Sequence, residues 1–295
     1  MEYFVRHRTA YRYVQDVSSS CHVAHLLPRE TPRQKVLEAE LVFAPQPALV
    51  RRAVDYFGNI QNLFTIEEAH SVLEVSSESR VVTEAAPNLD PALDVPWESV
   101  RAELETARDD DSRDAAQYLF DSPLILALPD IAEYAEISFT PGRGILTAAA
   151  DLTTRVHKDF RYDTTVTDAY TPVEKVFHIR AGVCQDLAHV AIAALRAIGL
   201  SARYVSGYLL TAPPPGQPRL VGADASHAWF AIWAPGFGWI DFDPTNNMQA
   251  GESHITAAWG RDYSDVTPIS GVITGGGEHI VDVGVDVVPV GEESL

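Results

Sequence analysis

The feature that most constrains the fold is the segment from Gly182 to Leu200, GVCQDLAHVAIAALRAIGL, in which a glycine turn leads into an amphipathic run. Its apolar residues recur at intervals of three and four, as they do on one face of an α-helix, and Gly199 provides a stop. The pattern predicts a helix whose first turn holds Cys184. Its apolar face consists of Leu187, Val190, Ala191, Ala194, Leu195 and Ile198.

Cys184 lies where a nucleophilic thiolate would be placed. The N-terminus of a helix carries partial positive charge and unpaired N–H groups, which ease ionisation of a thiol and binding of an oxyanion. An isolated cysteine is more often a small buried hydrophobe, so this prediction depends on finding a base nearby.

Composition narrows the class of protein. The chain of 295 residues is 46% hydrophobic, enough for packed cores, and its net charge of −19 argues against nucleic acid as a partner. Its two cysteines, Cys21 and Cys184, lie too far apart to suggest a disulfide framework, which fits a reducing compartment. Since no stretch has the apolar character of a signal peptide or a membrane span, we expect a cytoplasmic protein without a membrane partner.

The chain divides into three predicted segments, and together they indicate an α+β fold. Residues 1–95 alternate polar and apolar side chains, with breaks at prolines and at Gly58–Asn59, and predict an N-terminal antiparallel, sandwich-like β-domain. Residues 96–143 form a polar helical connector, whose acidic run at 103–114 lacks the spacing of a calcium loop. In residues 144–295 we expect helices at 145–160 and 182–200, then strands at 202–210, 225–233 and 239–243, and a final strand at 281–287.

The candidate base is His227, which lies in DASHAWFAIW and is followed by the turn APGFG and the strand WIDFD. These are the signals of a β-hairpin. If Trp233 pairs with Trp239, Trp229 lies opposite Asp243, which is then a diagonal neighbour of His227 on the same face.

Asp243 is therefore the preferred orienting carboxylate, with Asp241 one step further away and Asp224 a weaker candidate in a loop. Asp243 precedes Pro244 and has the alternative role of capping a turn. A metal site built from His178, Cys184, His189 and His227 is the competing interpretation, but no known ligand spacing supports it. His189 is about 140° around the helix from Cys184. No metal and no cofactor is predicted.

Three ordered motifs, GVCQDLAH, DASHAWFAIW and GWIDFDPTNN, resemble those of the bacterial transglutaminase-like superfamily, which includes candidate cysteine proteases. DYFGN at 55–59 and GRDYSDVTPISG at 260–271 resemble a two-domain subgroup with an N-terminal β-domain. The resemblance implies a papain-like, transglutaminase-like α+β core in residues 144–295. It also implies Cys184 as nucleophile, His227 as general base and acid, and Asp243 as orienter.

The activity implied is attack of the Cys184 thiolate on a protein or peptide amide, including glutamine amides, to form a thioester. The Cys184 backbone N–H is the first expected oxyanion donor and Tyr162 the second, although a buried structural tyrosine is the alternative for Tyr162. Trp229, Trp233 and Trp239 either line a substrate groove or pack the hairpin, and packing is favoured.

The sequence leaves the acyl acceptor open, so transglutaminase, protease and amidase activities all fit. A catalytically inactive binding or scaffold protein that retains the fold is the alternative class. A calcium-regulated crosslinker lacks the expected calcium loop. Substrate identity and oligomeric state are not determined by the sequence.

Overall fold

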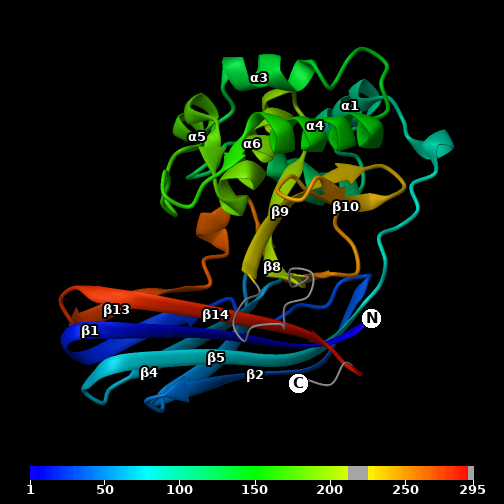
Figure 1. Cartoon of the computed structure of the whole chain (residues 1–295). Coiled ribbons are helices and arrows are strands. Elements are labelled where there is room, and N and C mark those ends of the chain that lie inside the picture. The colour runs from blue at the N-terminus through cyan, green and yellow to red at the C-terminus, as the bar shows by residue number, and fades with distance from the viewer. Residues whose placement is uncertain (212–224, 292–295) are drawn as a thin grey trace, which may run out of the picture.

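The computed structural model describes residues 1–211 and 225–291, which form two antiparallel sheets with a helical layer over the second (Figure 1). This confirms the predicted α+β class. The first sheet contains β1 (Glu2–Ala24), β2 (Gln34–Ala44), β3 (Leu49–Val54), β4 (Ile60–Ile66), β5 (His70–Thr83), β13 (Ile269–Gly275) and β14 (His279–Pro289). The second contains β8 (Ala202–Leu209), β9 (Ala225–Ala234), β10 (Gly238–Asp243), β11 (Met248–Gln249) and β12 (His254–Gly260).

Six α-helices lie in the described residues, and together they bury one face of the second sheet (Figure 1). Short segments connect them, including the two-stranded pair of β6 and β7 that precedes α6. The helices are α1 (Trp97–Thr106), α2 (Asp110–Ala116), α3 (Pro129–Glu136), α4 (Ile145–Asp159), α5 (Val173–Ile179) and α6 (Cys184–Ala197). The shorter elements are β6 (Arg161–Tyr162), β7 (Ala181–Gly182), and the 3₁₀ turns η1 (Pro91–Leu93), η2 (Gln117–Leu119) and η3 (Tyr263–Asp265).

The long strand β1 organises the first sheet, because its two halves have different neighbours. Residues 2–12 pair with β5 and β14, whereas residues 17–24 pair with β4 and β13, and the register shifts between the halves. Side chains of the first half alternate between buried and exposed, with Tyr3, Val5 and Thr9 inside. The predicted sandwich-like segment is thus one continuous sheet that curls (Figure 1).

The sheets and cores divide the chain differently from the three predicted segments. β13 and β14 lie beyond residue 260, within the predicted catalytic segment 144–295, yet both pair with β1 in the N-terminal sheet. The helices of the predicted connector 96–143 share one core with α6, to which they contribute Trp97, Val100 and Ile131. Local sequence pattern carries no information about these long-range pairings, which explains the difference.

Helix α6 is the central element of the core, since its apolar face is buried by the sheet and by neighbouring helices. All six residues of the predicted apolar face are buried, and Gly199, with φ +81°, ends the helix in the conformation that favours glycine. None of the helices in the described ranges is long and apolar enough to cross a bilayer.

Arg196, near the C-terminal end of α6, is 4% exposed and has all its bonds to neutral acceptors. Its guanidinium donates to the carbonyls of Tyr118, Ala202 and Arg261 at 2.7–2.9 Å and to the Ser122 hydroxyl at 3.1 Å. One side chain therefore ties the connector to the core sheet.

We expect Arg196→Met to lower the free energy of unfolding by about 2–4 kcal/mol, because it leaves buried carbonyls without donors. Urea unfolding followed by circular dichroism measures the change. Arg113→Met is the matched control: Arg113 forms an exposed ion pair with Asp110 on α2, and its loss should cost under about 0.5 kcal/mol. Equal losses in the two variants would contradict the role given to Arg196.

Candidate active site

Cys184 is the first residue of α6 and is partly buried. The carboxylate of Asp186, in the first turn, folds back and accepts a hydrogen bond from the Val183 N–H at 2.8 Å. A Cβ on Gly182 would lie 2.5 Å from that carboxylate, so glycine is required there. The turn thus places the thiol at the positive end of the helix, as the sequence predicted.

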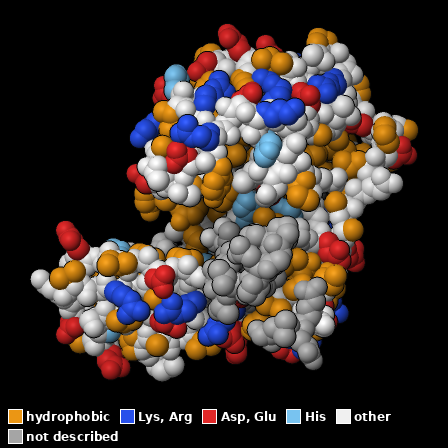
Figure 2. Space-filling model, in the orientation of Figure 1, with side chains coloured by type: hydrophobic (Ala, Val, Ile, Leu, Met, Phe, Trp, Pro, Cys, Tyr) orange, Lys and Arg blue, Asp and Glu red, His pale blue; other side chains and the backbone are white. Residues whose placement is uncertain are grey.

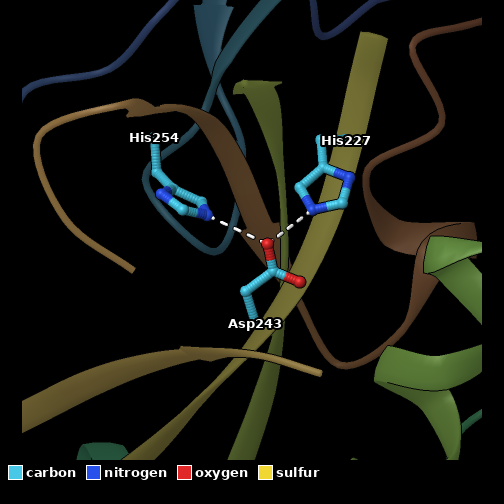
Figure 3. Close-up of side chains that lie close together, drawn as sticks. All are labelled: His227, Asp243 and His254. Carbon is cyan, nitrogen blue, oxygen red and sulfur yellow. Dashed lines mark hydrogen bonds and ion pairs between the residues drawn. The ribbon is translucent and has the colours of Figure 1, made fainter. Parts of the chain in front are cut away.

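The predicted hairpin register is confirmed. Trp239 pairs with Trp233, and the ladder continues to Phe242 opposite Phe230. His227 on β9 and Asp243 on β10 meet on one face, with 2.8 Å between His227 Nε2 and Asp243 Oδ2 (Figure 3).

Asp243 also caps the turn, as the alternative interpretation of this residue predicted. Its Oδ1 accepts from the N–H groups of Thr245 and Asn246 at 2.9 and 3.1 Å. Its Oδ2 accepts from His227 and from the Asn246 side-chain amide at 2.7 Å. Asp243 is fully buried, which alone would raise its pKa, but the hydrogen bonds from His227 and His254 outweigh burial and lower the pKa of this carboxyl.

The imidazole of His227 links Asp243 to Cys184. Nε2 faces Asp243, and Cys184 lines the same cavity as the imidazole, close enough to act on its pKa. Burial lowers the pKa of His227, but the hydrogen bond to Asp243 and the neighbouring Cys184 and Asp243 raise it to about 10. The protein therefore favours the protonated imidazole, as a thiolate–imidazolium pair requires.

His254, the first residue of β12, contacts Asp243 as well and was not predicted. Its Nε2 lies 3.0 Å from Asp243 Oδ2, and its Nδ1 accepts from the Gly251 N–H at 3.3 Å (Figure 3). The acceptor role of Nδ1 fixes the proton on Nε2, so His254 donates to the carboxylate. β12 lies at the far edge of the sheet, next to β8, and no register count within the hairpin includes it. Alternation in HITAAW was the available signal, but it predicts a strand and not this contact.

The nitrogen and oxygen atoms of His227, Asp243 and His254 lie within 4.8 Å of one another, close enough to be considered as metal ligands. Both imidazoles, however, are paired with Oδ2 by hydrogen bonds, and these bonds explain the arrangement without an ion. The metal set considered from the sequence is not assembled: His178 is exposed on α5, and the buried His189 accepts from the Tyr263 N–H at 3.2 Å.

The remaining candidates lie outside the Asp243 cluster. Asp241 lies one step along β10 and pairs with Arg33 at 3.2 Å, and Asp224 lies outside the described residues. Tyr162 is 54% exposed, so the alternative of a buried structural tyrosine is wrong. Partial burial raises the pKa of Tyr162, and the charges of Cys184 and Asp186 raise it further, which places its hydroxyl within their field. Gln185, which follows Cys184 in the helix, donates to the Ala169 carbonyl at 2.9 Å.

Cys184 and His227 line a cavity of about 340 Å³ between the two sheets. One wall comes from the core, including Tyr204 and Tyr263, and the other from the N-terminal sheet, including Tyr11 and Val283. Figure 2 shows hydrophobic side chains and histidines gathered where the two halves meet, with charged side chains mostly on the outer surfaces. The first sheet therefore forms part of the candidate site.

Two regions of the chain match known protein families. Residues 3–82 match the bacterial transglutaminase-like N-terminal region. Residues 138–244, which include Cys184, His227 and Asp243, match the transglutaminase-like superfamily. An uncharacterized protein of Mycobacterium tuberculosis is 41% identical over 99% of this chain and 94% of its own.

Two further proteins carry descriptive names. A Pseudomonas aeruginosa protein-glutamine gamma-glutamyltransferase is 39% identical over 71 residues, 24% of this chain and 11% of that protein. The crystal structure of a candidate cysteine protease from Cytophaga hutchinsonii superposes with a TM-score of 0.76 at 21% identity, covering 100% of this chain and 92% of that one. The fold, the two matched regions and the full-length relative show that this chain belongs to the transglutaminase-like superfamily, with the bacterial N-terminal region in front of the core.

Proposed function

We propose that this protein is an enzyme that transfers or hydrolyses acyl groups of protein or peptide amides through a thioester on Cys184. The observation that carries the proposal is that Cys184, at a helix N-terminus, and His227, which is hydrogen-bonded to Asp243, line the same cavity. Nucleophile, base and orienting carboxylate in this order are the parts that covalent acyl transfer needs.

In the proposed reaction the Cys184 sulfur attacks the amide carbonyl carbon and forms a tetrahedral oxyanion. Protonated His227 then donates its proton to the departing nitrogen, the carbon–nitrogen bond breaks, and a thioester remains. Neutral His227 next takes a proton from water or an amine, which attacks the thioester and releases the thiolate. The backbone N–H of Cys184 and the hydroxyl of Tyr162 are the proposed oxyanion donors.

The names of two similar proteins support chemistry on amides: one is a gamma-glutamyltransferase and the other a candidate cysteine protease. An inactive scaffold that retains the fold is the alternative class. Such a protein would have no need for a buried carboxylate held by two imidazoles beside a thiol. We therefore favour an active enzyme, and we propose that it acts in the cytoplasm.

Iodoacetamide labelling at pH 6–8 tests the reactive thiol. We expect Cys184 to react at least about tenfold faster than the exposed Cys21, because imidazolium stabilises the thiolate at neutral pH. The raised pKa of His227 keeps the imidazole charged until the pH approaches about 10, so this preference should persist across the range.

Mass spectrometry of the labelled peptides gives both rates in one sample. The preference should vanish in His227→Ala and persist in His178→Ala, which removes an exposed histidine on α5. Equal, slow labelling of Cys21 and Cys184 in the wild type would favour the inactive scaffold.

The acyl acceptor is tested with glutamine-containing peptides in the presence and absence of a primary amine. A transglutaminase should release ammonia and incorporate the amine, whereas a hydrolase should yield glutamate or a cleaved peptide at a rate that the amine does not change. Coupled ammonia detection and peptide mass spectrometry separate these outcomes. Cys184→Ala, the control, should abolish both reactions.

His254 should act as a positioning residue, since it holds Asp243 and lies one contact away from His227. We expect His254→Phe to lower kcat roughly tenfold with little change in KM, because it removes one donor to a buried carboxylate. His254→Gln retains an N–H donor and should recover part of kcat. A variant that loses only thermal stability, with normal kcat in the folded fraction, would assign His254 a purely structural role.

A further inference from the structure

A second and larger cavity, of about 620 Å³, lies between the core sheet and loops of the N-terminal segment. Arg203 on β8 and Asp241 on β10 line it, and neither belongs to the Cys184 cavity. His254, which is hydrogen-bonded to Asp243, lines this cavity as well. The larger cavity is therefore separate from the thiol and adjacent to its orienting carboxylate.

Arg203 is the unusual residue of this cavity, because it is 7% exposed, its Nε is buried without a hydrogen-bond partner, and no hydrogen bond or ion pair joins its guanidinium to another described residue. Arg196 is equally buried and donates four hydrogen bonds. Burial lowers the pKa of Arg203 only to about 10, so the guanidinium is charged at neutral pH. A buried charge without a partner is strongly unfavourable, and here the cavity is the side from which a partner can come.

The surroundings of Arg203 restrict what can bind. The guanidinium carbon lies 4.4 Å from the ring centre of Trp239 and 3.7 Å from that of Trp259, so aromatic rings cover the guanidinium plane. Its N–H edges remain for a ligand, and that fork matches the two oxygens of a carboxylate.

A second arginine, Arg33, has an N–H group without an acceptor. Arg33 Nη2 pairs with Asp241 at 3.2 Å, but its Nη1 is buried without a partner. Asp241 forms its ion pair with Arg33 and acts on Arg203 only through its charge, so Arg203 and Nη1 of Arg33 both lack an acceptor among the described residues. Exposed acidic residues, Glu84, Asp111 and Asp114, also line the cavity and disfavour a doubly charged anion.

We propose that this cavity binds a monocarboxylate with an apolar or aromatic body. The carboxylate would pair with Arg203 and with the free Nη1 of Arg33, and the body would pack on the tryptophan walls formed by Trp229, Trp239 and Trp259. This site does not depend on the chemistry proposed for Cys184.

Isothermal titration calorimetry with 3-phenylpropionate tests the site on the full chain. We expect one equivalent to bind in the millimolar range or tighter, and Cys184→Ala to bind equally well. Arg203→Met should weaken binding at least about tenfold, and Arg203→Lys should lie between, since it retains charge without the fork. Arg101→Met, which removes an arginine stacked on Trp97 away from the cavity, should bind like the wild type.

Thermal denaturation of the empty protein gives a second readout. Because Arg203 has no hydrogen bond or ion pair to lose, and a methionine still packs on Trp239 and Trp259, Arg203→Met should melt no lower than the wild type. If that variant fails to fold, Arg33→Met tests binding of the ligand's carboxylate at a less buried arginine. Two comparison ligands can overturn the proposal: 3-phenylpropionamide, if it binds as tightly as the acid, and 3-phenylpropyl phosphate, if it binds more tightly. The proposal is also overturned if binding of the acid shows no saturation at about 10 mM, or if the Arg203 and Arg33 variants both bind the acid normally.

Discussion

The buried carboxylate of Asp243 is the interaction on which the candidate active site depends. It is 0% exposed and would be too costly to bury as a charge without donors on both oxygens. Its donors come from β9, from the start of β12 and from the turn after β10. A single side chain thus holds three parts of the core sheet in register and fixes the imidazole that faces Cys184.

The curled N-terminal sheet contributes to the candidate site as well as to the fold. β1 and β14 provide one wall of the cavity around Cys184, and β14 reaches β1 only because the end of the chain returns to the first sheet. The access of water and amines to a thioester depends on such walls. The N-terminal sheet is therefore where discrimination between acceptors would be built.

Arg196 on α6 and Arg203 on β8 are both buried, but they differ in their hydrogen bonds. Arg196 donates four hydrogen bonds, to three carbonyls and a hydroxyl, and it joins segments far apart in the sequence. Arg203 has aromatic rings over its plane and no acceptor at its edge. The first pattern belongs to a structural residue, and the second to a residue that lacks its partner. Both arginines occur in apolar runs, so sequence alone does not distinguish them.

The sequence by itself determined the local elements and pointed to three candidate site residues, Cys184, His227 and Asp243. Alternating residues predicted the strands β1, β8, β9 and β10, and apolar residues at intervals of three and four predicted α6. The register of the β9–β10 hairpin placed Asp243 beside His227, because strand pairing across a short loop is a local property. Only the tertiary structure decided the contact of His254 with Asp243, the return of β13 and β14 to the first sheet, and the cavity at Arg203. These depend on chain crossings and long-range pairings, whose geometry is set by the packing of whole elements and leaves no periodic signal in the residues involved.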